Sequence, residues 1–272
     1  MISSTFFTLA VIGYVCATGL ALAYLVQRHD LIHRLGSVAT LGGWVCHSLA
    51  LVIRGVEMGR PPLASLPEAV SVAVWVVVLL EMWAERHYGV RVLGAFVLPV
   101  AVMLSMSAVG RPLEGPDIDR ALSGAWLWVH IGLALIGIAA FVLNFAGAVM
   151  YLLQERALKA KSSTGMFARL PALQVIDDIG YRSLMLGFPF MTLGLVLGLV
   201  VAESTYGRVD FLDPKILLSV LMWVVYLIMV YMRLSAGWRG RRAALLASVA
   251  FAAAIVAWMA NYFSGMHRFI AS

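Results

Sequence analysis

Residues 123–153 read SGAWLWVHIGLALIGIAAFVLNFAGAVMYLL, a run without a single Lys, Arg, Asp or Glu. A helix needs about 20 mainly apolar residues to cross the roughly 30 Å hydrocarbon core of a bilayer. This run exceeds that length, and Gln154, Glu155 and Arg156 follow it where a helix would emerge into water. The segment therefore predicts a long membrane-spanning helix with one histidine, His130, inside its apolar stretch.

Similar apolar runs, each bounded by charges, Pro or Gly, recur along the chain. They cover approximately residues 3–26, 35–54, 67–84, 90–109, 123–153, 183–203, 215–232 and 243–263. The first run has no basic segment before it and no clear small-residue cleavage site, so we interpret it as a retained span rather than a signal peptide. The pattern predicts an all-α polytopic transmembrane helical bundle of about eight spans, with residues 1–272 forming a single transmembrane domain.

The composition supports a membrane protein and disfavours most other classes. Of the 272 residues, 62% are apolar and 12% are charged, whereas a soluble domain has roughly 45–50% apolar and about 25% charged residues. The mean hydropathy of +0.92 agrees with this. A soluble enzyme, a disordered chain, a disulfide scaffold and a nucleic-acid-binding domain are all disfavoured. The two cysteines, Cys16 and Cys46, form no CxxC pair.

Lys and Arg set the expected orientation, because cytoplasmic loops of membrane proteins carry an excess of both. Most of the 20 Lys and Arg residues fall in the loops that follow the odd-numbered apolar runs. Those loops are predicted to be cytoplasmic, which places both termini outside. The net charge of +6 then reflects topology rather than an anionic partner, and we expect no nucleic-acid partner.

Three histidines from three predicted spans reach the same outer layer of the membrane. His130 lies about seven residues inside the outer end of its span, or roughly 10 Å deep at 1.5 Å per residue. His47 lies at a similar depth in the span 35–54, and His267 follows the span 243–263 on the same side. The other three histidines, His29, His33 and His87, fall in predicted cytoplasmic loops.

An imidazole inside hydrocarbon is costly and usually has a partner or a task. Two axial histidines hold the iron of a b-type haem in many membrane proteins, and cations at the outer rim are candidates to bind its propionates. The available cations there are Arg54, Arg111, Arg120, Arg208, Lys215 and Arg268. The alternative is that these histidines only bond to neighbouring helices. Zinc is less attractive, because none of His47, His130 and His267 is part of an HxxxH or HxxE spacing.

Several segments together resemble one family of membrane proteins. They are PPLASLPEAVSVAVW at 61–75, the histidine-bearing run from Trp128 to Arg156, LPALQVIDDIGYRSLMLGFPFMTLGLVLG at 170–198, Asp213-Pro214-Lys215, and Gly265-Met266-His267. In order and spacing they resemble the cytochrome c assembly family, with its CcsA-type and HemX-like members. The resemblance implies a polytopic helical fold, haem binding through His130 and His267, and a role in cytochrome c biogenesis.

The chain departs from the family's full synthases at two places. Where they have a tryptophan-rich outer loop, WGxxWxWDPK, this sequence has YGRVDFLDPK at 206–215. Where they have an inner histidine that binds a second haem, Tyr231 stands here. These departures put haem delivery to an apocytochrome in doubt and resemble the HemX-like branch, which implies an influence on haem synthesis through glutamyl-tRNA reductase. His47 resembles a feature of that branch.

The sequence thus predicts a bacterial inner-membrane protein that binds haem b rather than an enzyme. His130 and His267 are the expected axial ligands, and His47 is either a competing ligand or a hydrogen-bond partner in the same cavity, where spans two, five and eight converge. Three hypotheses remain open: a haem-handling factor acting outside with an apocytochrome or an assembly partner, a regulator whose cytoplasmic loops bind a haem-biosynthesis enzyme, and a haem-free transporter or structural protein.

One acid lies well inside a predicted span. Glu81 is four residues before Glu85 and near the inner surface. We expect it to snorkel, to pair with Arg86 or Arg182, or to take part in proton transfer.

Overall fold

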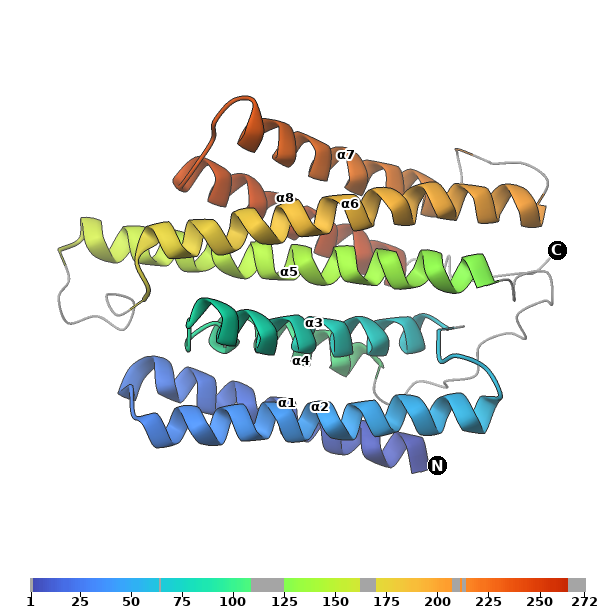
Figure 1. The fold of residues 1–272 in the computed structure, drawn as a ribbon, viewed down its shortest axis with the longest axis horizontal. Helices are drawn as coiled ribbons and strands as arrows, with labels where there is room; N and C mark the ends of the chain where they lie inside the picture. The colour runs from blue at the N-terminus through green and yellow to red at the C-terminus, as the bar shows by residue number, and fades with distance from the viewer. Residues whose placement is uncertain are drawn as a thin grey trace.

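The computed structural model describes residues 2–63, 65–108, 125–161, 170–206, 211 and 214–263. In these ranges the chain forms eight helices and no strand (Figure 1). The helices are α1 (Ile2–Gln27), α2 (Asp30–Met58), α3 (Leu66–Tyr88), α4 (Gly94–Ala108), α5 (Ala125–Lys159), α6 (Leu173–Tyr206), α7 (Pro214–Leu234) and α8 (Arg241–Phe263).

The all-α membrane fold predicted from the sequence is confirmed. Within the described ranges, α1, α2, α3, α5, α6 and α7 are long and apolar enough to cross a membrane, and α4 is a shorter apolar helix. The main difference from the expected spans is the start of α6, which lies ten residues before the predicted 183. α4 begins after position 90 because Leu93 N–H donates to Val90 O in a turn that precedes the helix.

The helices run side by side and alternate in direction, so the start of α1 and the end of α8 lie at the same end of the bundle (Figure 1). α5 is central and packs against α6, α8, α3 and α4, whereas α2 packs chiefly against α1 and α3. The bundle therefore has an α1–α4 side and an α5–α8 side that meet along α5.

Small residues allow the two closest helix pairs to approach. A Cβ on Gly13 of α1 would lie 2.9 Å from the Cα of Gly43 on α2, and a Cβ on Gly137 of α5 would lie 3.2 Å from the backbone N of Met191 on α6. Such contacts are the usual means of helix association in membranes, where lipid tails remove most of the hydrophobic driving force. The α5–α6 contact positions the histidine described next.

Candidate functional site

His130 lies in the second turn of α5 and points at α6. Its Nδ1 is 2.6 Å from the carbonyl oxygen of Gly194. A carbonyl oxygen only accepts hydrogen bonds, so Nδ1 carries the proton and donates it. The lone pair is then on Nε2, which has no hydrogen-bond partner among the described residues. The ring is half-buried, and its free nitrogen is a candidate metal ligand.

Gly198, one turn after Gly194, makes room for this ring. A Cβ at position 198 would lie 2.6 Å from Cε1 of His130 and 2.9 Å from Nδ1, which is closer than real Cβ contacts allow. The glycine is therefore required by the packing of the imidazole against the backbone of α6. Together, Gly194 and Gly198 fix both the position of His130 and its tautomer.

His47 has a different environment. It is fully buried on α2, and its Nδ1 is 3.1 Å from the hydroxyl of Tyr14 while its Nε2 is 2.8 Å from the hydroxyl of Ser71. The ring of Phe7 also packs against it at 5.3 Å. Because both ring nitrogens have partners, this geometry favours His47 as a hydrogen-bond partner within the bundle over His47 as a haem ligand.

The structure does not bring His47 and His130 into one cavity. The contacts of His47 on α2 come from α1 and α3, whereas those of His130 come from α6. The expected convergence of spans two, five and eight is seen only for α5 and α8, since α3 packs between α2 and α5. His267 lies outside the described residues.

The cations expected at the outer rim are described only in part. Arg54 forms an ion pair with Glu68, with Nε 3.2 Å from Oε1, and Arg60 binds the other oxygen of Glu68 at 2.9 Å. Lys215 lies in the first turn of α7, but its side chain is outside the described part. The remaining expected cations, Arg111, Arg120, Arg208 and Arg268, also lie outside it.

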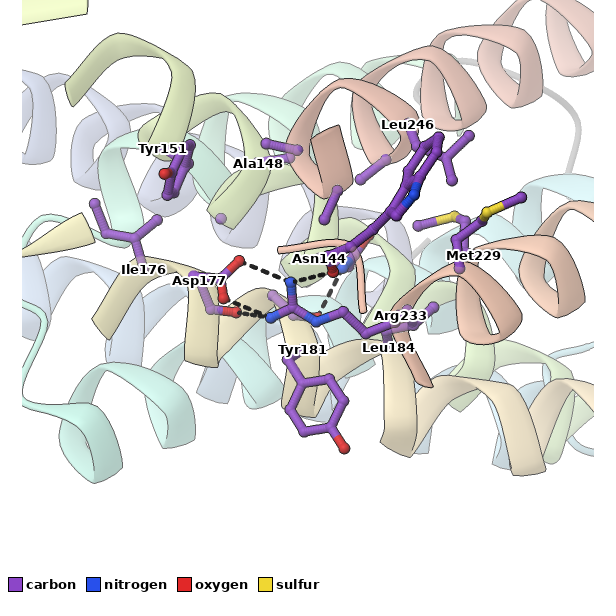
Figure 2. A pocket seen from close by; sticks show the side chains of 17 residues that line it. Asn144, Ala148, Tyr151, Ile176, Asp177, Tyr181, Leu184, Met229, Arg233 and Leu246 are labelled. Atoms are coloured by element: carbon purple, nitrogen blue, oxygen red, sulfur yellow. Dashed lines mark hydrogen bonds and ion pairs between the residues drawn. The ribbon is translucent and has the colours of Figure 1, made fainter. Parts of the chain in front are cut away.

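A second feature is a pocket lined by residues of α5, α6, α7 and α8 (Figure 2). It lies at the end of these helices opposite His130. Asp177 on α6 accepts two hydrogen bonds from Arg233 on α7, Nη1 to Oδ1 at 2.9 Å and Nη2 to Oδ2 at 2.6 Å. Asp177 also accepts from the backbone N–H of Gly240, just before α8, at 3.0 Å. Asn144 on α5 lines the pocket, and its Oδ1 is buried without a partner in the described structure.

The sequence did not point to this cluster. The predicted sixth span begins at 183, which assigned Asp177 to a loop, and Arg233 was counted only as a cytoplasmic charge. The available signal was the neighbouring pair Asp177 and Asp178 inside an otherwise apolar stretch. Tyr231, at the position of the family's inner histidine, is 59% exposed on α7 and does not line the pocket.

The fold and composition define a polytopic helical membrane protein. The family described as "Cytochrome C assembly protein" matches residues 63–269, which is more than half of the chain. This chain therefore belongs to the cytochrome c assembly protein family, and it is a membrane protein of cytochrome c assembly.

Individual relatives of this chain carry names that agree with this family. The chain is 24% identical over 269 residues to "Cytochrome c biogenesis protein CcsA" of Guillardia theta, a match that covers 91% of this chain and 89% of the relative. It is 26% identical over 242 residues to the protein of that name from Prochlorococcus marinus strain MIT 9301, covering 80% and 78%. The Pyropia yezoensis protein is 25% identical over 299 residues, covering 92% and 94%. The match therefore covers between 78% and 94% of the length of each of these relatives.

Proposed function

We propose that this chain binds haem b at the end of the bundle where His130 lies and handles or relays it on the outer side of the membrane during cytochrome c assembly. The observation that carries the proposal is the hydrogen bond from His130 Nδ1 to Gly194 O at 2.6 Å. A metal-ligating histidine almost always donates its other ring N–H to a carbonyl, a carboxylate or water, which fixes the tautomer and the ring orientation. His130 has this arrangement, with Nε2 left as the ligand atom.

The described part of the donor set fits a haem iron. His130 supplies one axial imidazole, and we propose His267 as the second, in keeping with the two axial histidines common to membrane b-type haems. Trp126, one turn before His130, and Val129 beside it are 65% and 45% exposed, and they supply apolar surface for a porphyrin ring. When bound, the haem would supply the iron chemistry, while the protein binds and orients it.

The propionates need cations near water. We propose Lys215 and Arg208 for this role, with Arg111, Arg120 and Arg268 as further candidates. Arg54 is a weaker candidate, because it is already paired with Glu68. We propose binding and transfer of haem rather than catalytic turnover.

A visible absorption spectrum of the detergent-purified chain, reconstituted with haem, tests the proposal. The expected result is a low-spin six-coordinate spectrum that is lost in His130→Ala and restored in His130→Gly by added imidazole. His87→Ala is the matched control, because His87 is an exposed histidine stacked on Trp83 at the other end of the bundle. A chain that binds no haem, or a spectrum unchanged in His130→Ala, overturns the proposal and favours the haem-free transporter or structural role.

A second candidate is a HemX-type regulator that binds a haem-biosynthesis enzyme, glutamyl-tRNA reductase, at its cytoplasmic loops. The observation that favours it is the absence of tryptophan from residues 206–215, where the resemblance would place the haem-presenting loop. Deleting the gene separates the two functions. Loss of c-type cytochromes supports haem handling, whereas altered tetrapyrrole levels with normal c-type cytochromes support regulation.

As its location we propose the bacterial inner membrane. The support is the excess of Lys and Arg in the loops that follow odd-numbered spans, which is the pattern of cytoplasm-facing loops. Membrane fractionation of the source cell with the chain tagged tests this location.

A further inference from the structure

Three titratable side chains gather at the end of the bundle opposite His130, on the α1–α4 side. Glu81 lies on α3 and is 2% exposed. Glu85, one turn later, and His33 on α2 have side chains that are 20% and 21% exposed. The three side chains thus lead from a partly exposed edge to a fully buried carboxyl group, and the proposed haem site does not use them.

Glu85 joins the other two. Its Oε1 is 2.9 Å from Nε2 of His33, and its position four residues after Glu81 places the two acidic residues on the same face of α3. Two neighbouring carboxyl groups repel each other when both are ionised, and burial adds to the cost of the charge on Glu81. These two effects favour a single proton held between Glu81 and Glu85. The ring of Tyr24 packs against His33 at 5.1 Å and keeps it beside Glu85.

The surroundings of Glu81 are close-packed. Its Oε1 faces Gly94, where a Cβ would lie only 3.1 Å away, so the carboxyl group fills the space at the start of α4. A negative charge placed in such a site without a bonded cation is costly. A proton shared by Glu81 and Glu85 limits the charge of the carboxyl pair to minus one.

The charged groups around this cluster come from each neighbouring element. On α3, Arg86 acts electrostatically on Glu81 but donates its Nη1 to the carbonyl oxygen of Met82 at 3.0 Å. Just after the end of α1, Arg28 lies over the ring of Tyr24. Between α3 and α4, Arg91 pairs with Asp30 of α2 at 2.9 Å. The nearby cations therefore hold other groups as well, and His33 is the basic side chain that contacts Glu85.

We propose that Glu81, Glu85 and His33 form a proton-exchange site that makes the packing of α2, α3 and α4 sensitive to pH. A proton from water is taken up at Nδ1 of His33 while Nε2 gives its own proton to Oε1 of Glu85, which shares it with Glu81; release follows the same path in reverse. When the proton leaves, a further negative charge remains in a buried site, and the cost of keeping it from water separates α3 from the start of α4, where Glu81 faces Gly94.

Infrared spectroscopy of the full chain, purified in detergent at neutral pH, tests the shared proton. The wild-type chain is expected to show the C=O band of a protonated carboxyl group, and Glu81→Gln is expected to lose it. Glu68→Gln is the matched control, since Glu68 is an equally buried acid on the same helix but is paired with Arg54 and Arg60. Absence of the band in the wild type, or its survival in Glu81→Gln, overturns the proposal.

Two further measurements test exchange and pH sensitivity. In D2O the band is expected to shift more slowly in His33→Gln than in the wild type, without disappearing; an unchanged exchange rate rules out the path through His33. The unfolding temperature of the wild type is expected to fall as the pH rises above neutral, and that of Glu81→Gln to stay level, because Gln carries no charge. An equal fall in both chains contradicts the pH-sensitive packing. None of these readouts depends on haem.

Discussion

Gly198 allows α6 to approach His130 closely, because a larger side chain there would overlap the imidazole ring. It is therefore the most informative single residue of the proposed site. Gly198→Ala would place a methyl group 2.6 Å from the imidazole in the present geometry. The ring must then move, and its hydrogen bond to Gly194 O is lost. Disturbing such a support typically weakens metal binding by about 10–100-fold. We expect a loss of that size in a haem titration of the purified variant.

Gly132→Ala is the control for that substitution. Gly132 lies on α5, two residues after His130, and a Cβ there meets nothing within 4 Å. It should therefore leave haem affinity unchanged. If Gly198→Ala binds haem like the wild type, haem binding does not need the orientation that α6 gives the imidazole. The hydrogen bond from His130 to Gly194 O would then no longer support the proposed function.

His47 is expected to stabilise the bundle rather than to bind haem. His47→Leu leaves the buried hydroxyl groups of Tyr14 and Ser71 without their present partner. An unsatisfied buried polar group costs about 1–3 kcal/mol, so denaturant or thermal unfolding in detergent should show a destabilisation of that order. The haem spectrum should be unaffected. Loss of the haem spectrum at normal stability would show instead that His47 is a ligand.

At the scale of the helices, hydropathy located every element but misplaced some of their ends. The predicted sixth span starts at 183 because Asp177, Asp178 and Arg182 interrupt the apolar run. The helix nevertheless begins at Leu173, since each of these charges has a partner: Asp178 pairs with Arg182 one turn away, and Asp177 pairs with Arg233 on α7. The first pairing is local and visible in the sequence. The second depends on the packing of two helices and is not.

The start of α3 shows a signal that the sequence did contain. Ser65 accepts a hydrogen bond from the backbone N–H of Glu68, and Glu68 accepts one from the backbone N–H of Ser65. This reciprocal pattern is a capping box, readable as Ser followed three residues later by Glu. The sequence could not show that the carboxylate of Glu68 also binds Arg54 and Arg60. Arg54, one of the cations expected at the haem, is therefore already paired.

The Asp177–Arg233 pair is expected to hold α6, α7 and the start of α8 together. Arg233 is 8% exposed in its side chain, so Asp177→Asn leaves a buried guanidinium without its carboxylate. Removing one partner from such a bond costs about 1–3 kcal/mol, and more for charged groups. We expect a loss of at least this order in the free energy of unfolding, measured in detergent.

Asp178→Asn is the neighbouring control. Asp178 and Arg182 form a pair within α6 with side chains that are 42% and 58% exposed, and exposed pairs one turn apart contribute only about 0.3–0.5 kcal/mol. The two substitutions remove the same charge from adjacent residues. Equal effects would show that the cross-helix pairing does not stabilise the bundle.

At the scale of the molecule, depth along the helices was predictable but lateral position was not. Counting residues correctly placed His47 and His130 toward the same end of the bundle, because rise per residue is fixed in a helix. Which helices lie next to each other depends on where small residues permit close contact, as at Gly13 with Gly43 and at Gly137 with Met191. Those contacts are specified by pairs of distant residues, so the separation of the two histidines emerged only from the structure.

The side of the membrane on which His130 lies follows from charge. The alternating helices put Ile2 and His130 at one end of the bundle and Arg239 at the other, and the positive-inside rule predicts that the Arg239 end is cytoplasmic. In a chain carrying Cys16→Ala and Cys46→Ala, a membrane-impermeant maleimide added to intact cells should label Ile2→Cys. It should label Arg239→Cys only after the membrane is permeabilised. The reverse pattern would place His130 on the cytoplasmic side, and haem bound there would lie at the wrong surface for an outside apocytochrome but at the right one for a cytoplasmic enzyme. The labelling result therefore orients the protein, and the reverse pattern would contradict haem handling on the outer side.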